Sequence, residues 1–262
     1  MIRFLKRFST LTFIILISIN YAFTQNSRLN DDNSIGWYNY FGTIKLNDKY
    51  SLHTEYQFRR TNFISNPQQG LLRTGLNYQV NPKLQLRLGY AWIETFPYGD
   101  IPINGMGKEF TEHRIFQMAT LTDKVSSIDL SHRFMLEQRW IGRYTNASFD
   151  KQDDFIFLNR FRYMFRLQVP LKGKSVVNKT AYLALYDEIF IGFGQNVNEN
   201  IFDQNRVGLI LGYRFSNSLR IETGYLNQIV QLGREVNNRN VFQHNNGVIL
   251  NTIFNFDFSK KK

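Results

Sequence analysis

The stretch from Ser127 to Trp140 alternates between two kinds of side chain at successive positions. Its even-numbered positions are mostly apolar and include Phe134 and Leu136, whereas its odd-numbered positions carry four charges. Those charges belong to Asp129, Arg133, Glu137 and Arg139. Because successive side chains of a strand point to opposite faces, this period of two predicts a strand between a polar and an apolar environment.

The same alternation returns in eleven segments between residue 35 and the C-terminus. Several of these segments are about ten residues or longer, whereas strands of soluble proteins usually have about five or six. Short turns and longer polar loops join them alternately, and the longest loop covers 96–111. Tight turns at one end and long loops at the other are typical of transmembrane β-barrels.

The expected number of strands follows from the parity of such barrels. Bacterial single-chain barrels normally have an even number of antiparallel strands. Eleven segments therefore leave one strand to be found, and the polar residues 25–34 are the place left for it. We predict one all-β, antiparallel up-and-down barrel over 25–262, with about twelve strands, short periplasmic turns and longer extracellular loops. A barrel of about ten strands is the alternative.

Composition favours a barrel and excludes several other classes of protein. Aromatic residues make up 16% of the 262 residues, yet the mean hydropathy is −0.35. No run of 18 apolar residues follows residue 24, which excludes a transmembrane helix there. The absence of cysteine excludes disulfides, thiolate metal sites and a lipid anchor on cysteine.

Four aromatic residues toward the strand ends predict an interfacial girdle. They are Tyr90, Trp92, Trp140 and Tyr186.

Residues 1–24 have the features of a cleaved secretory signal peptide. Three basic residues precede an apolar core at 8–19, and the small residues Ala22 and Thr24 fit cleavage after Thr24. An uncleaved N-terminal anchor is the alternative. Together with the barrel pattern, the signal predicts the outer membrane of a Gram-negative bacterium, where membrane lipid is the expected partner.

The formal net charge of +11 would suggest nucleic-acid binding in a soluble protein. Here many arginines lie on strand faces beside carboxylates, so no nucleic-acid partner is predicted. By alternation, sixteen charged residues face the interior of the barrel. They are Glu55, Arg59, Arg73, Arg87, Arg114, Arg133, Glu137, Arg139, Arg160, Arg162, Arg166, Glu188, Arg206, Arg214, Arg220 and Glu222.

This arginine-rich lumen has two interpretations. The charges can form a lattice of ion pairs and hydrogen bonds that holds the walls at a fixed spacing, as in a plugged structural barrel. They can also form a cationic constriction in a porin-like narrow channel that selects small anionic solutes. The two interpretations are compatible with each other.

A catalytic role is the runner-up hypothesis and depends on His132. His132 and Asn159 occupy the lipid-facing phase of their strands, where outer-membrane acyl hydrolases place a His–Ser pair. Ser131 adjoins His132 in the sequence, but adjacent strand residues point to opposite faces, so Ser131 cannot be its partner. The sequence singles out no serine on a neighbouring strand, and we predict no catalytic residues.

The sequence contains no motif for binding a metal or a cofactor. His53, His113 and His244 show no metal-ligand spacing, and there is no phosphate-binding glycine loop or G-x-S-x-G motif. We therefore predict a protein that is not an enzyme and holds no metal or cofactor. The alternatives are an outer-membrane lipid acyl hydrolase and a soluble periplasmic lipid- or ligand-binding β-barrel.

Five sequence segments resemble one bacterial protein family. They are E-H-R-I-F-Q at 112–117, L-S-H-R-F-M-L-E-Q-R at 130–139, N-R-F-R-Y at 159–163, D-E-I-F at 187–190 and Asn-Arg at 205–206. These segments are similar to the family called domain of unknown function 2490, from about Trp37 to the C-terminus. The resemblance implies a secreted outer-membrane barrel from Bacteroidetes-type bacteria and implies no particular activity.

Overall fold

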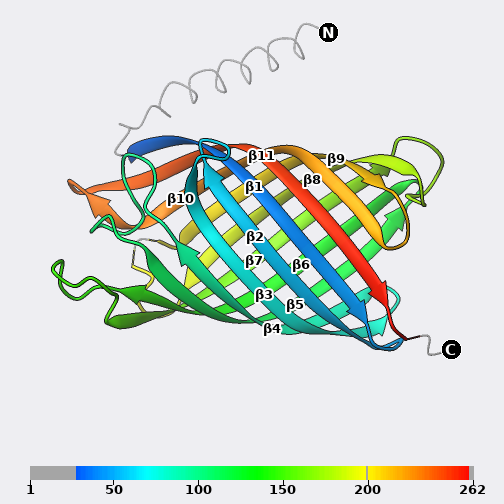
Figure 1. The fold of residues 1–262 in the computed structure, drawn as a ribbon, viewed down its shortest axis with the longest axis horizontal. Helices are drawn as coiled ribbons and strands as arrows, with labels where there is room; N and C mark the ends of the chain where they lie inside the picture. The colour runs from blue at the N-terminus through cyan, green and yellow to red at the C-terminus, as the bar shows by residue number, and fades with distance from the viewer. Residues whose placement is uncertain (1–27, 199, 260–262) are drawn as a thin grey trace, which may run out of the picture.

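The computed structural model describes residues 28–198 and 200–259, so the predicted signal peptide at 1–24 lies outside the described residues. The described chain forms eleven β-strands that close into one barrel (Figure 1). The strands are β1 (Arg28–Lys45), β2 (Tyr50–Thr61), β3 (Asn66–Asn81), β4 (Leu84–Thr95), β5 (Phe110–Val125), β6 (Ile128–Arg143), β7 (Asp154–Pro170), β8 (Thr180–Phe193), β9 (Phe202–Arg214), β10 (Leu219–Val236) and β11 (Arg239–Asp257). Among the described residues there is no helix that is both long and apolar enough to span a membrane.

The two faces of the barrel wall differ in the way that the alternation predicts. On β6, Glu137 and Arg139 are buried, whereas Phe134 is 40% exposed. On β4, Leu88 and Trp92 are 60% and 47% exposed. Large apolar side chains therefore cover the outside of the wall, and charged side chains lie within it. The all-β barrel predicted from the sequence is confirmed.

The barrel closes through a parallel pair. All other neighbouring strands are antiparallel, but β1 and β11 run in the same direction, from Arg28 beside Asn240 to Lys45 beside Asp257. A meander with an odd number of strands must close in this way, because its first and last strands point the same way. The described residues thus form eleven strands, close to the expected count of about twelve.

The segment in which a further strand was expected is the beginning of β1. Residues 28–34 extend this strand and pair one by one with β11. Because β11 is 19 residues long, it offers backbone partners along this whole segment. Backbone hydrogen bonds therefore hold these polar residues in a strand without an apolar alternation.

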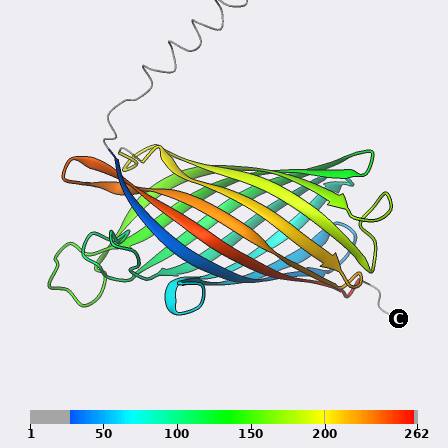
Figure 2. The ribbon, with the colours of Figure 1, turned by 90° about the horizontal axis from the view of Figure 1, so that it is seen from above.

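The two ends of the barrel carry different connections (Figure 2). One end, called the loop end, carries the start of β1 and the loops that follow β4, β6 and β8. The other end, called the turn end, carries the end of β11 and most of the short turns. Three connections depart from the predicted alternation of lengths: 171–179 at the turn end is long, whereas 62–65 and 237–238 at the loop end have four and two residues. Asn237 and Asn238 have φ values of 53° and 56°, which suit a tight hairpin turn.

Two tyrosines of β8 lie flat inside the wall against glycines of β9. Tyr182 is opposite Gly212 and Tyr186 is opposite Gly208. A Cβ atom at either glycine would lie 2.2 Å from a ring atom of its tyrosine, so only glycine leaves room for these rings. Tyr186 is therefore an interior residue, and its assignment to the outer aromatic girdle was wrong. It has the same phase as Glu188, two residues further along β8.

The other three predicted girdle residues lie on the outer face of the wall. Tyr90 and Trp92 are 44% and 47% exposed. Trp140 packs against Phe157, with ring centres 5.2 Å apart.

Candidate functional site

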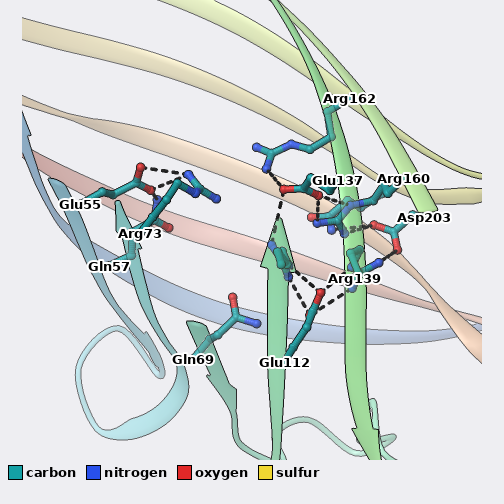
Figure 3. Close-up of polar contacts among 12 residues, drawn as sticks. Glu55, Gln57, Gln69, Arg73, Glu112, Glu137, Arg139, Arg160, Arg162 and Asp203 are labelled. Atoms are coloured by element: carbon teal, nitrogen blue, oxygen red, sulfur yellow. Dashed lines mark hydrogen bonds and ion pairs between the residues drawn. The ribbon is translucent and has the colours of Figure 1, made fainter. Parts of the chain in front are cut away.

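Glu112 on β5 is a buried carboxylate inside the barrel, and it is 2% exposed. Arg114 on β5 and Arg139 on β6 both donate to it from Nε, each at 2.5 Å. Figure 3 shows the contact between Arg139 and Glu112. Arg139 also reaches Asp203 on β9, with Nη1 3.3 Å from Oδ1. Because β6 and β9 are three places apart around the barrel, this last contact crosses the interior.

Glu137 on β6 is fully buried and accepts hydrogen bonds from two arginines of β7. Arg160 donates from Nε to Oε2 at 2.7 Å, and Arg162 donates from Nη1 to Oε1 at 2.8 Å. Arg160 also donates to Asp203 at 2.6 Å (Figure 3). Arg162 continues to Glu188 on β8 at 2.7 Å. Each of these buried charges therefore has partners of opposite sign, which offset the cost of removing it from water.

These contacts form one continuous network, which we call the ion-pair lattice. Arg133 on β6 completes it by donating to Glu188 at 2.8 Å. Its members are Glu112, Arg114, Arg133, Glu137, Arg139, Arg160, Arg162, Glu188 and Asp203. Five guanidinium groups share four carboxylates, so the ion-pair lattice is nearly neutral and connects β5 through β9.

A second group of polar contacts surrounds Glu55 on β2. Arg73 on β3 donates from Nη1 to both carboxylate oxygens of Glu55, at 2.8 and 2.9 Å. His53 Nε2 lies 2.9 Å from Oε2, and Gln57 donates to Oε1 at 2.5 Å. These contacts stay within two neighbouring strands, unlike those of the ion-pair lattice.

A third group surrounds Glu222 on β10. Arg166 on β7 donates to Oε1 at 2.6 Å, and the hydroxyl of Tyr182 donates to the same oxygen at 2.7 Å. Asn251 on β11 donates to Oε2 at 3.0 Å. This single carboxylate thus connects four strands near the turn end.

Four further interior arginines have no carboxylate within 4.0 Å among the described residues. They are Arg59, Arg87, Arg206 and Arg220. The first three donate instead to neutral glutamine or asparagine oxygens. The guanidinium carbon of Arg220 lies 5.6 Å from the centre of the Tyr182 ring. The positive charge in the interior therefore exceeds what its carboxylates neutralise.

Of the sixteen charges assigned to the interior by alternation, Arg214 is placed differently. It is the last residue of β9, and it donates to the backbone oxygens of Ser216 and Val176 at the turn end. The long side chain of a residue at a strand end can turn toward the connections. The other fifteen lie along the inner face of the wall.

Two members of the ion-pair lattice, Glu112 and Asp203, were not among the residues selected from the sequence. Glu112 has the same phase as Arg114, so alternation could have identified it. Asp203 could not be found in this way, because the pairing of β8 with β9 shifts register there: Phe190 faces Gln204 and the next pair skips Asp203. Both Asp203 and Gln204 are consequently 7% exposed, although they are adjacent.

Two cavities occupy the interior and meet at three arginines. The outer cavity, about 520 Å³, lies toward the loop end and is lined in part by Tyr98 and Asn104 of the loop after β4. The inner cavity, about 250 Å³, lies deeper in the barrel. The side chains that border both cavities are Arg59, Arg114 and Arg206. Whatever moves from one cavity to the other must pass these guanidinium groups.

The loop 96–109 lies across the loop end of the barrel. It connects β4 with β5 but is bound to β1, three places from β4 around the barrel, and to β10, five places from β5. The backbone amides of Asp100 and Ile101 donate to the carboxylate of Asp31 on β1, at 3.3 and 3.1 Å. Arg234 on β10 donates to the backbone oxygen of Pro102 at 2.7 Å. The loop therefore narrows the entrance to the outer cavity.

Two residues of this loop fit closely at its crossing point. Gly99 has a φ of 74°, and a Cβ atom there would lie 2.3 Å from Asp31 Oδ2. Asn245 of β11 donates to the hydroxyl of Tyr98 at 3.2 Å. Burial raises the pKa of Tyr98 above its ordinary value.

His132, the residue behind the catalytic hypothesis, lies among aromatic side chains. Its Nδ1 is 2.8 Å from the hydroxyl of Tyr163, and its ring centre is 4.9 Å from that of Phe165. Ser131 lines a separate cavity at the turn end. Among the described residues, no group of three or more His, Cys, Asp or Glu side chains is arranged to hold a metal ion.

Comparison with known proteins gives a family but no activity. Residues 35–240 match the family described as "Protein of unknown function (DUF2490)". A solved structure titled "NanC porin structure in rhombohedral crystal form" is similar, with 11% sequence identity and a TM-score of 0.43. The similarity covers 78% of this chain and 90% of that one and is too low to support a functional conclusion. No functionally curated protein matches the sequence.

Proposed function

This chain belongs to the DUF2490 family of proteins of unknown function, and we propose that it is an integral outer-membrane β-barrel that conducts small anionic solutes. The observation that carries the proposal is the arrangement of apolar and charged side chains, which is the reverse of that in a soluble protein. Apolar side chains cover the outside of the barrel wall, and ionised side chains lie inside it.

The outer face supports insertion into a membrane. Leu88, Leu209 and Tyr225, on three different strands, are 60%, 55% and 49% exposed. In water, each such side chain would lack the stabilisation of about 1.5–3 kcal/mol that burial provides. Soluble monomers also rarely expose a continuous apolar surface. In a bilayer the same side chains contact acyl chains, while the closed ladder satisfies the backbone groups of the strands.

The inner face supports selection of anions. Eleven arginines and seven buried carboxylates lie along it, counting the described residues and leaving out Arg214 at the turn end and Arg234 at the loop end. The carboxylates are those of Asp31, Glu55, Glu112, Glu137, Glu188, Asp203 and Glu222. An excess of fixed positive charge in a narrow, poorly solvated passage attracts anions and repels cations.

The surroundings of His132 support a role in packing. A serine nucleophile would need a base within hydrogen-bond reach, and Nδ1 of this histidine contacts a tyrosine hydroxyl. A second histidine on the outer face, His113, has the same kind of partner, with Nδ1 2.6 Å from the hydroxyl of Tyr90. Such His–Tyr pairs on an outer face suit the amphipathic boundary of a membrane.

Conductance across a planar bilayer tests the proposal. The purified barrel is expected to open discrete pores, and in a KCl gradient the reversal potential should have the sign of chloride selectivity. An inserted but electrically silent barrel would support the plugged, structural interpretation. Recovery of the protein in the soluble periplasmic fraction without detergent would overturn both membrane interpretations.

Charge variants sharpen this test. Replacing Arg87 and Arg220 by glutamine removes two interior charges that have no carboxylate partner, and the ratio of chloride to potassium permeability is expected to fall. The matched control is Lys172→Gln with Lys174→Gln, which removes two charges from an exposed turn. Equal effects of the two double variants would show that selectivity does not arise in the interior.

A further inference from the structure

Arg59 of β2 and Arg206 of β9 lie over the same aromatic ring, that of Trp37 on β1. Their guanidinium carbons are 3.8 and 4.8 Å from the ring centroid. Arg206 also lies 4.5 Å from the centroid of the Phe190 ring. Contacts with ring faces attract guanidinium groups, and these aromatic side chains therefore help to hold two cations close together.

Both arginines are buried, with 6% and 9% of their surface exposed. Among the described residues neither has a carboxylate within 4.0 Å. A buried cation without a counter-ion is unfavourable, and the repulsion between two such cations adds to the cost. The contrast with the neighbouring ion-pair lattice, in which every guanidinium has an acid partner, makes this pair of charges a candidate binding site.

The guanidinium group of Arg206 is oriented so that one edge is available. Its Nε donates to Gln204 Oε1 at 2.9 Å. Gln204 is itself fixed by a hydrogen bond to Asp203 at 2.9 Å and by one from Gln228 at 2.8 Å. Among the described residues, no acceptor contacts the two Nη atoms of Arg206. Since Arg206 borders both cavities, its guanidinium group lies at the passage between them.

We propose that the Nη edge of Arg206, with Arg59 beside it, binds the carboxylate group of small organic acids as they cross the barrel. This inference rests on the proposed function, because the acid reaches the site through the interior. It goes further in assigning a saturable site of defined chemistry at the narrow section between the cavities.

The geometry of the site favours a carboxylate over other small solutes. Two parallel N–H bonds at the Nη edge match the two oxygens of a planar carboxylate, and such a charge-assisted pair is stronger than a contact with a spherical ion. A neutral sugar would leave both buried cations without a carboxylate in direct contact. Cavities of about 250 and 520 Å³ admit small organic acids on either side of the site.

Trp37 provides a direct measure of binding. The chain has three tryptophans, and the other two, Trp92 and Trp140, lie on the outer face. In a W92F/W140F background in detergent, the fluorescence of Trp37 reports changes in the guanidinium groups over its ring. Titration with acetate or succinate is expected to give a saturable change, and glucose at the same concentrations is expected to give none.

Variants at Arg206 separate recognition of a carboxylate from simple attraction of charge. R206K keeps the positive charge but loses the planar pair of donors, so the carboxylates are expected to bind about tenfold or more weakly. R206Q is expected to abolish saturation. The matched control is R60Q, because Arg60 adjoins Arg59 on the same strand but donates to backbone oxygens of the loop after β2. Heat-dependent mobility in gel electrophoresis verifies that each variant is folded.

The outcomes distinguish this inference from the proposed function. Chloride-selective conductance without a saturable Trp37 response would overturn the inference and leave the channel intact. A saturable response in a barrel that conducts no ions would support the site and overturn the channel. Unchanged carboxylate affinity in R206K, or equal loss in R60Q, would also overturn the assignment of the site to the Nη edge.

Discussion

Arg166 Nη2 on β7 lies 2.6 Å from Oε1 of Glu222 on β10, and these two strands are three places apart around the barrel. The pair therefore spans the interior instead of running along the wall. Tyr182 donates to the same carboxylate oxygen at 2.7 Å. A solute that crosses this level must pass beside the pair, so the width of the passage here depends on an electrostatic contact.

Removing one partner of this pair is expected to destabilise the barrel. R166Q leaves Glu222 buried without its cation, which costs about 3–5 kcal/mol in the free energy of unfolding. The double variant R166Q/E222Q is expected to lose less than the sum of the two single variants. Urea unfolding of the barrel from lipid vesicles, followed by tryptophan fluorescence, measures this coupling.

The control for this cycle is the exposed pair of Lys83 and Asp123, 2.8 Å apart, whose side chains are 65% and 53% exposed. Its removal is expected to change stability by about 1 kcal/mol or less. A loss in R166Q no larger than in this control would contradict the assignment of Arg166 and Glu222 to a confined interior.

A charge on the outer face is expected to oppose membrane insertion. Leu88 lies within β4 and is 60% exposed, so Leu88→Arg places a cation among acyl chains at a cost of about 2–4 kcal/mol near the bilayer midplane. Folding yield into vesicles measures the effect. Ile64→Arg, in the turn after β2, adds the same charge outside the strands and is expected to fold normally. Improved solubility of L88R in water, with unchanged structure, would favour a soluble barrel.

Gly208 is expected to be intolerant of a methyl group. Gly208→Ala brings a Cβ atom to 2.2 Å from the Tyr186 ring, and the resulting displacement is expected to cost about 1–3 kcal/mol of stability. Gly70→Ala on β3 is the matched control, since a Cβ atom there has no neighbour within 4 Å. Thermal unfolding in detergent compares the two. The idea fails if both variants lose the same stability.

The loop 96–109 is expected to depend on Asp31. Asp31→Ala removes the acceptor of the Asp100 and Ile101 amides, which should exchange their hydrogens faster. A wider entrance should also raise the single-channel conductance. Asp150→Ala, in the exposed loop after β6, is the control and is expected to change neither quantity. Unchanged exchange at residues 100 and 101 in D31A would show that other contacts hold the loop.

Alternation along single strands was sufficient to predict which face most charges occupy. Glu55 and Arg160 are 3% and 2% exposed, as their phase in the sequence indicates. The pairing of these charges could not be predicted, because it depends on how strands are placed around the barrel. Arg139 and Asp203, for instance, are 64 residues apart in the sequence and come from strands that do not touch.

The features that escaped prediction involve register or parity. Asp203 lies at a register shift, where a count by twos along the strand fails. Tyr186 is different, because alternation with Glu188, two residues further along β8, already assigns it to the interior. The number of strands was expected to be even. The first and last strands of an antiparallel meander pair in opposite directions only when the number of strands is even. Residues 28–34 pair with β11 through their backbone, and this pairing produces no alternation of apolar and polar side chains in the sequence.

The parallel contact of β1 with β11 has a consequence for the topology of the whole protein. Arg28 begins the first strand at the loop end, and Asp257 finishes the last strand at the turn end (Figure 1). In a membrane, the strand that starts the wall and the strand that completes it therefore emerge into different compartments. Epitopes joined ahead of Arg28 and behind Asp257 would be reached by antibodies from opposite sides, whereas an even-stranded barrel would present both on the same side.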